Sequence, residues 1–354
     1  MVRLAGAGYL TAATGQAAPR RPSYPLEVPP SLTRQGRLVL RLAQTAVVLQ
    51  VVLVVTGTAV RVTGSGLGCP TWPRCTGSSL TNTAALGTHG AIEFGNRLLA
   101  VVMEGVGLAL VLAVRRVPHP RSWSRLALLQ AAVVPLQAVI GGLLVLSGLN
   151  PYVLILHFLT SFPLVYGAAA LLRRVLDTAP SHDPRTEHGR SDGDPARAGS
   201  VDHRVVEMLS GALVAASALA LVLGTLVTGT GPHAGDPTVS RLPFNPQNVT
   251  QLHADAVYLL AGLTLATALA AWRTPYRSAV LGLVALLVAQ GGIGYWQYFT
   301  GVPPVLVGLH VLGATLVFTT AAWLHETARA RAAAPLRQTA EPTPVHAAGT
   351  ATAR

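Results

Sequence analysis

Charged residues are scarce in this sequence, and one of the four charged residue types, lysine, is absent. Charged residues make up 11% of the 354-residue chain, and all 26 basic residues are arginine because there is no lysine. A soluble domain carries about 25% charged residues. The hydrophobic residues, 51% of the chain, gather in runs of about 20, the length that crosses roughly 30 Å of hydrocarbon. This composition excludes an ordinary soluble domain and predicts a polytopic membrane protein.

The surplus of positive charge, +12 at pH 7, does not call for a nucleic-acid partner. In membrane proteins, arginine accumulates in cytoplasmic segments. Both terminal segments and the loops on their side of the predicted membrane hold 22 arginines. The other side holds three, Arg61, Arg74 and Arg241, and Arg97 lies inside a predicted span. We therefore expect no nucleic-acid partner, a location in the lipid bilayer of the cell membrane, and cytoplasmic N and C termini.

One segment of the sequence occurs twice. Seven of 21 positions are identical between 137–157 and 290–310 at a constant offset of 153, where background composition predicts roughly two. The shared residues include Gln137 and Gln290, and His157 and His310. Each copy has the pattern of an apolar helix, a tight Gly/Pro turn and a second apolar helix with a histidine near its start. The repeat predicts a membrane protein built from two similar halves.

The apolar runs predict an all-α membrane protein with eight transmembrane helices. The predicted spans are 42–60, 92–114, 126–147, 152–172, 205–227, 252–272, 278–299 and 304–324. Each half has four spans, so both halves cross the membrane in the same direction, as in parallel repeats related by a pseudo-two-fold axis. The expected organisation is a cytoplasmic tail (1–41), a four-helix bundle (42–172), a cytoplasmic linker (173–204), a second four-helix bundle (205–324) and a cytoplasmic tail (325–354).

Cysteine is also scarce. The two cysteines, Cys69 and Cys75, both lie in the first outward loop, within GCPTWPRC. That compartment is oxidising, so a disulfide that closes this short loop is plausible. A pair at this spacing is also compatible with a metal or redox motif.

Four polar residues lie at similar depth in the predicted spans. His157 and His310 lie near the start of the fourth and eighth spans, His253 opens the sixth, and Asn96 takes the matching place in the second. At 1.5 Å per residue, all four lie within roughly 10 Å of the outward membrane edge. Histidines on facing helices of a bundle can bind heme iron from both sides, so we predict that His253 and His310 bind a heme. Asparagine is a poor iron ligand, which leaves the iron beside His157 five-coordinate, weakly ligated or held by another residue.

Two further residues accompany Asn96 in the first half. His89 shares a helix face with Glu93 and Asn96 if the second helix begins early; otherwise it is a loop histidine. Glu93 either forms an ion pair with Arg97 four residues on or places a charge beside a reacting substrate, where it stabilises a cationic intermediate or moves a proton.

The sequence does not decide which groups some polar side chains bond to. Gln137 and Gln290 bond either across helices or to a cofactor edge. The three outward arginines named above pair either with heme propionates or with phospholipid headgroups.

Together these motifs resemble the bacterial heme A synthase family. The residues that carry the resemblance are VTGSGLGCPTWPRC after the first span, IEFGNRLLA in the second, LHFLTS in the fourth, QLHADAVYLLAG in the sixth and GLHVLGATL in the eighth. The resemblance covers roughly residues 40–325.

The resemblance implies an enzyme that oxidises a ring methyl of heme O to the formyl group of heme A. It implies that His253 and His310 are the axial ligands of a permanent heme b, that His157 faces the substrate heme, and that Glu93 lies at the reacting site. Cys69 and Cys75 are then the outward-loop pair of the family, and a histidine is expected where this chain has Asn96. The implied partners are heme O, delivered by a heme O synthase, and an electron donor or acceptor.

Two other functions compete with this interpretation. A diheme b-type cytochrome that relays electrons from quinol needs strong axial pairs in both halves, which Asn96 argues against. A transporter is suggested by the repeat, but transporters favour polar groups at mid-membrane, whereas the histidines here cluster near one face.

Overall fold

The computed structural model describes residues 33–178, 203–232 and 239–332, and the regular structure in these residues is helical. The elements are α1 (Arg34–Val62), the 3-10 turn η1 (Ala84–Leu86), α2 (Gly87–Arg115), α3 (Arg121–Leu146), α4 (Pro151–Leu159), α5 (Ser161–Leu176), α6 (His203–Thr230), α7 (Pro246–Ala271), α8 (Arg277–Phe299) and α9 (Pro304–Ala332). The predicted all-α fold is confirmed.

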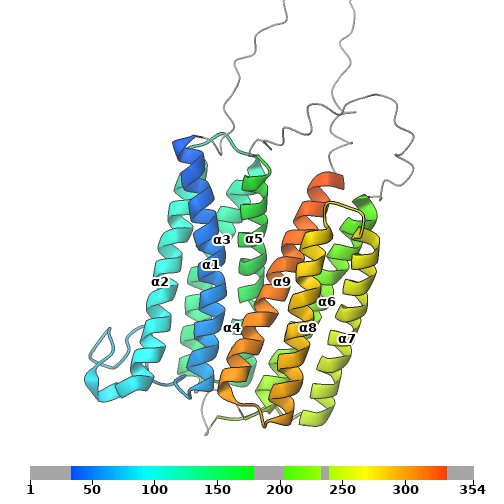
Figure 1. Cartoon of the computed structure of the whole chain (residues 1–354). Coiled ribbons are helices and arrows are strands. Elements are labelled where there is room, and N and C mark those ends of the chain that lie inside the picture. The colour runs from blue at the N-terminus through cyan, green and yellow to red at the C-terminus, as the bar shows by residue number, and fades with distance from the viewer. Residues whose placement is uncertain (1–32, 179–202, 233–238, 333–354) are drawn as a thin grey trace, which may run out of the picture.

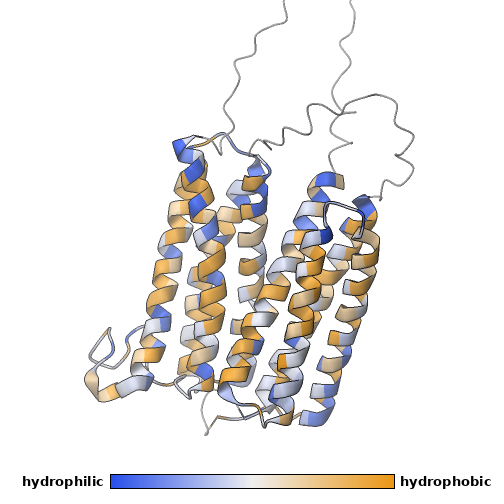
Figure 2. Ribbon diagram, in the orientation of Figure 1, coloured by the Kyte–Doolittle hydropathy of each residue, from blue (hydrophilic) through white to orange (hydrophobic). Residues whose placement is uncertain are grey.

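Among the described residues, eight helical stretches are long and apolar enough to cross a membrane, as predicted. Helices α4 and α5 follow each other directly and together make one of these stretches, Pro151–Leu176. Figure 2 shows the apolar residues along the middle of the helices and polar residues toward their ends. This distribution is the one that the interior of a bilayer requires.

Several helices run beyond the predicted spans. Helix α1 begins at Arg34, eight residues early, because the Thr33 hydroxyl accepts a hydrogen bond from Gly36 N at 2.8 Å and caps the helix. Helix α9 continues to Ala332 and so takes in the start of the predicted C-terminal tail. The rest of the predicted tails and linker, 1–32, 179–202 and 333–354, lies outside the described residues.

The helices form two groups that pack side by side. Figure 1 shows α1, α2, α3 and α5 on one side, α6 to α9 on the other, and α4 between them. Helices α1 and α5 contact α9, and α4 contacts α6. The start of α1 and the end of α9 lie at the same end of the bundle (Figure 1). The pseudo-two-fold axis and the cytoplasmic side of the termini stay predictions.

The two predicted hairpin turns have the same backbone geometry. Gly148 and Gly301 have φ of 62° and 77°, and the residues that follow, Leu149 and Val302, have φ of 61° and 60°. These values lie in the left-handed region, which glycine enters without steric cost. The repeated sequence therefore also repeats its local structure.

The fourth span departs from the prediction because it is broken at Thr160, between α4 and α5. Pro163 accounts for the break. It has no N–H to donate to the Leu159 carbonyl, and its ring crowds that carbonyl. In α9 the corresponding residue is Leu316, and α9 is one continuous helix.

Candidate functional site

His253 of α7 and His310 of α9 face each other inside the second helix group. Their ring centroids are 6.3 Å apart and their planes are inclined by 71°. A bond of about 2 Å from a metal to each imidazole nitrogen sets the centres of two axial rings about 6 Å apart. The observed separation fits two histidines on opposite sides of one iron atom.

Neighbouring groups orient these two imidazoles. His253 Nδ1 lies 3.0 Å from the Ala220 carbonyl, so it carries the proton and leaves Nε2 as the nitrogen for a metal. A Cβ atom on Gly224 would lie 3.3 Å from the His253 ring, and one on Gly294 would lie 3.1 Å from the His310 ring. These glycines let the helices approach closely enough to pack against the rings. The pair therefore fits a heme.

His157 of α4 has the same local surroundings as His310. A Cβ atom on Gly141 would lie 3.1 Å from its ring, the distance found between Gly294 and His310. Gln137 Nε2 donates to the His157 carbonyl at 3.0 Å, and Gln290 Nε2 donates to the His310 carbonyl at 2.6 Å. Both glutamines therefore bond across helices, the first of the two alternatives open at the level of sequence.

His157 also has a ring nitrogen that is available to bind a metal. Its Nδ1 atom is buried and has no hydrogen-bond partner among the described residues, and the same holds for His310 Nδ1. A buried polar atom left without a partner costs about 1–3 kcal/mol. A metal bound at Nδ1 removes this cost, because a neutral imidazole can bind a metal through either ring nitrogen.

Asn96 takes the place on α2 that His253 takes on α7, but its surroundings differ. The Thr56 hydroxyl of α1 donates to Asn96 Oδ1 at 2.7 Å. Thr56 thus holds the carboxamide against α1, much as the Ala220 carbonyl of α6 holds His253 in the other helix group. The sequence pattern did not single out Thr56, because a threonine in an apolar helix usually bonds only its own backbone.

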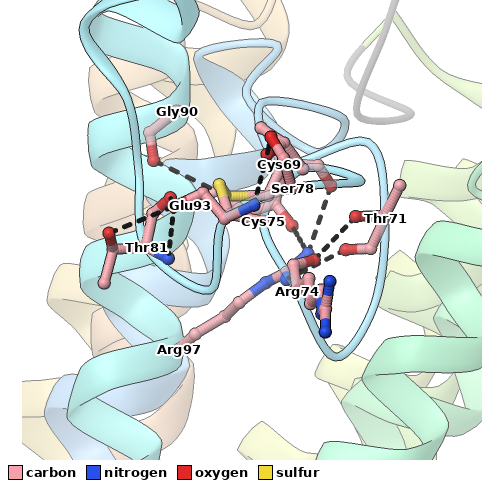
Figure 3. The surroundings of a disulfide bond; sticks show 11 residues. Cys69, Thr71, Arg74, Cys75, Ser78, Thr81, Gly90, Glu93 and Arg97 are labelled. Carbon is pink, nitrogen blue, oxygen red and sulfur yellow. Dashed lines mark hydrogen bonds and ion pairs between the residues drawn. A yellow bond between two sulfur atoms is a disulfide. The ribbon is translucent and has the colours of Figure 1, made fainter.

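Glu93 is tied to the loop that precedes α2. Its Oε2 accepts a hydrogen bond from Cys69 N at 2.6 Å, and its Oε1 forms an ion pair with Arg97 at 2.6 Å (Figure 3). Arg97 also donates to the carbonyls of Cys69 and Thr71, at 3.2 and 3.1 Å. The ion pair, the first of the two alternatives for Glu93, is present within α2, and both of its residues also bond to the loop. Glu93 is only 5% exposed, so this charge is held where water is scarce.

Cys69 and Cys75 form a disulfide, the first of the alternatives for this pair, and both are fully buried. The loop that they close packs on α3 through Trp72. A Cβ atom on Gly142 would collide with the Trp72 ring, while the preceding residue, Gly141, faces His157. The disulfide loop and His157 therefore contact adjacent residues of α3.

Known proteins resemble the chain over most of its length. A family model described as "Cytochrome oxidase assembly protein", COX15-CtaA, matches residues 40–322. A heme A synthase of Sphingopyxis alaskensis is 30% identical over 263 residues, 68% of this chain and 71% of that protein. Heme A synthases of Bacillus licheniformis and Lysinibacillus sphaericus are 32% and 34% identical over 122 and 132 residues, 34% and 37% of this chain and 39% and 42% of those proteins.

The chain belongs to the heme A synthase family. The eight apolar helices within the described part of the chain agree with this membership, and make this member a multi-pass membrane protein.

Other predicted residues lie apart from the histidines of this family member. His89 lies in the first turn of α2, so it shares a face with Glu93 and Asn96, but its Nδ1 lies 2.9 Å from Ser65 Oγ at the end of the bundle. Arg74 donates to the Gly77 carbonyl of its own loop at 3.2 Å, and Arg241 is exposed. The structure thus brings neither His89 nor Arg74 to a histidine.

Two polar features of the first helix group escaped the sequence interpretation. Gln50 donates to Gln130 at 2.9 Å, and Gln130 donates to the Leu164 carbonyl at 3.0 Å, all within the apolar interior. Glu104, near the middle of α2, has a buried carboxylate oxygen without a hydrogen-bond partner among the described residues. A carboxylate at mid-membrane depth is itself a signal of function, and it was available in the sequence.

Proposed function

We propose that this family member oxidises a ring methyl of heme O to the formyl group of heme A. In this proposal His253 and His310 are the axial ligands of a permanent heme b, and His157 binds the iron of the substrate. The observation that carries the proposal is the His253–His310 pair, whose 6.3 Å separation suits one iron between two imidazoles in a chain of the heme A synthase family.

The residues of the chain position the reactants. Substrate heme enters the first helix group laterally from the bilayer, and Gln137 and Gly141 orient His157 toward it. Glu93 keeps a negative charge at the end of the first helix group where His157 lies. There it stabilises positive charge that develops during oxidation of the methyl. Bound heme b supplies one-electron transfer to or from an external redox partner.

The methyl group is hydroxylated twice, each time in a two-electron oxidation, to an alcohol and then to a hydrate that loses water to give the aldehyde. With water as the oxygen source, the electrons and protons pass to an external acceptor; with O2 as the source, an external donor supplies the electrons that reduce the second oxygen atom to water. Asn96 cannot replace a second imidazole, so the substrate iron is held by one strong ligand. A substrate has to leave after reaction, and weaker ligation favours its departure.

The asymmetry of the site separates this function from its competitors. A diheme relay requires two strong axial pairs, but in the first helix group the place opposite His157 is taken by Asn96, which bonds to Thr56. A transporter does not explain the paired histidines. The partners that follow are heme O, a heme O synthase that delivers it, and an electron donor or acceptor. Both termini lie on the cytoplasmic side.

Optical spectra of purified variants test the assignment of the two hemes. Protein is produced in cells that make heme O, and its bound hemes are extracted and quantified. We expect His253→Ala to lose heme b and His157→Ala to retain heme b but lose heme O and heme A. Retention of heme b by both His253→Ala and His310→Ala would refute the assignment.

A further inference from the structure

The two histidine-bearing hairpins differ most in the helix that carries the histidine. His310 lies on α9, a single helix of 29 residues. His157 lies on α4, which has nine residues and ends at Leu159. Thr160 separates α4 from α5, and Pro163 removes a backbone hydrogen bond that would tie α4 to α5. His157 is therefore attached to the rest of its span more weakly than His310.

Side chains bridge the break where backbone hydrogen bonding is reduced. Gln137 of α3 uses both ends of its amide: Nε2 donates to the His157 carbonyl at 3.0 Å and to Ser161 Oγ at 2.8 Å, and Oε1 accepts from Thr160 Oγ1 at 2.8 Å. One side chain thus bonds to the last turn of α4, to the residue at the break and to the first residue of α5.

Gln290, the counterpart of Gln137, bonds less extensively. Its Nε2 donates to the His310 carbonyl, but its Oε1 is buried without a hydrogen-bond partner among the described residues. Gly313 stands where the first half has Thr160, and a Cβ atom there would collide with Gln290 Oε1. In α9 the continuous backbone therefore needs only one hydrogen bond from Gln290 at the histidine, whereas at α4 the side chain of Gln137 makes three hydrogen bonds across the break.

We propose that the break at Thr160 makes His157 a releasable ligand, and that Gln137 is the positioning residue that holds α4 with His157 toward the substrate iron. A helix interrupted by proline can bend at the interruption, because the missing hydrogen bond and the displaced carbonyl lower its stiffness there. When the Gln137 contacts open, α4 tilts and withdraws His157. The unbroken α9 has no such joint, so His310 stays fixed. This inference rests on the proposed binding of substrate heme by His157.

The difference between the halves matches the different fates of their hemes. A permanent cofactor requires ligands that do not move, and a substrate requires a ligand that lets go. Asn96 removes one strong ligand from the substrate iron, and the break lowers the cost of withdrawing the other. The same repeated architecture thus retains heme b in one half and lets the substrate heme exchange in the other.

Heme transfer to excess apomyoglobin measures this property directly. The full-length protein, purified with heme O and heme b bound, is mixed with apomyoglobin, and the absorbance change is resolved into phases. The His157→Ala variant, which lacks the substrate heme, identifies the phase that belongs to it. Pro163→Leu, which installs the residue found at the same place in α9, should slow this phase about tenfold, the order expected for one or two restored hydrogen bonds.

Gln137→Met provides an independent test that leaves the backbone sequence of the break unchanged. It preserves side-chain length but removes the amide, so it should speed the His157-dependent phase about tenfold. Gln290→Met is the matched control and should leave that phase unchanged. The heme b spectrum reports whether each variant has folded.

Three results would overturn the proposal. If Pro163→Leu and Gln137→Met release substrate heme at the wild-type rate, with the His157-dependent phase present, the break has no role in exchange. Equal acceleration by Gln137→Met and Gln290→Met would show a general loss of stability. A wild-type protein without any His157-dependent phase would contradict the proposed function itself, and this inference with it.

Discussion

At the scale of single residues, the two helix groups differ most clearly where one has an imidazole and the other a carboxamide. His253 bonds to the Ala220 carbonyl, while Asn96 receives the Thr56 hydroxyl at 2.7 Å. An imidazole offers iron a strong nitrogen ligand, and a carboxamide does not. Heme held by His157 should therefore have one open axial side, and heme held by His253 and His310 should have none.

Exchanging the two residues tests this difference. We expect Asn96→His to supply a second axial imidazole, convert the substrate heme from high to low spin, and weaken its binding of carbon monoxide at least about tenfold, since the gas must then displace a histidine. The reciprocal control, His253→Asn, should open heme b to carbon monoxide. Electron paramagnetic resonance and carbon monoxide titration measure both effects. A substrate heme that is already low-spin in the wild type would contradict this account of Asn96.

Glu93 contributes both a negative charge and a hydrogen bond that anchors the loop, and a substitution can separate the two. Glu93→Gln keeps an oxygen for the Cys69 amide but removes the charge that pairs with Arg97. If the charge stabilises the reaction, heme A yield falls more than about tenfold in this variant, while heme b content stays at the wild-type level. Extraction and chromatography of the hemes give both numbers. Normal heme A yield from Glu93→Ala would remove Glu93 from the mechanism.

At the scale of elements, the disulfide loop and the broken span give the first half its particular character. The loop is held to α2 by Glu93 and Arg97 and to α3 by Trp72 on Gly142. It thus lies across the end of the helix group near His157. A substitution that disturbs the contact between Trp72 and α3 should loosen the loop without changing the transmembrane helices.

Gly142→Ala tests the contact between the loop and α3. The added methyl collides with the Trp72 ring, so the loop should shift outward and expose the buried disulfide. We expect dithiothreitol to reduce the disulfide several times faster than in the wild type, as followed by labelling of the released thiols. Gly292→Ala is the control, since a Cβ atom there meets nothing within 4 Å. Equal reduction rates in the two variants would show that Trp72 does not hold the loop.

Sequence patterns predicted some of these elements and missed others for identifiable reasons. Repeated Gly148 and Gly301 predicted both hairpins because a left-handed turn leaves few alternatives. The break at Thr160 was missed although Pro163 is visible, because the apolar run continues across it. The contacts of Trp72 and Thr56 could not be predicted, since they join segments that are distant in sequence and have no common pattern.

At the scale of the whole molecule, the two helix groups meet along α5 and α9. Phe162 and Val165 pack against Phe318 in the apolar interior. Near the end where α9 finishes, buried Glu326 accepts hydrogen bonds from Tyr166 at 2.9 Å and from Arg174 at 2.8 Å. This polar cluster fixes one group against the other. Sequence patterns do not indicate this cluster, because Glu326 falls in the predicted cytoplasmic tail.

Removing the carboxylate should loosen this junction. Glu326→Ala leaves Arg174 and the Tyr166 hydroxyl without their partner and should lower the free energy of unfolding by about 1–3 kcal/mol, less than for a fully buried pair because Arg174 is 23% exposed. Thermal unfolding in detergent measures the loss. Asp255→Ala, at an exposed carboxylate, is the control and should change stability by less than about 0.5 kcal/mol. Equal melting temperatures for the two variants would show that the cluster contributes nothing to the junction.

The eight spans follow from length and hydropathy, which depend on the bilayer and not on packing. Membership of the heme A synthase family also follows from motifs that are continuous in sequence. How the groups meet, and which histidines face each other, depends on side chains brought together from distant helices. His253 and His310, 57 positions apart in the chain, were paired by depth alone, and the 6.3 Å between their rings shows that they meet.

Chromatography of extracted hemes tests the central claim most directly. The full-length protein is produced together with a heme O synthase in cells that lack their own heme A synthase, alongside its His157→Ala variant. The account predicts heme A in cells with the wild-type protein, and only heme O and heme b in cells with the variant. Absence of heme A from the wild-type cells, with the protein folded and heme b bound, would contradict it.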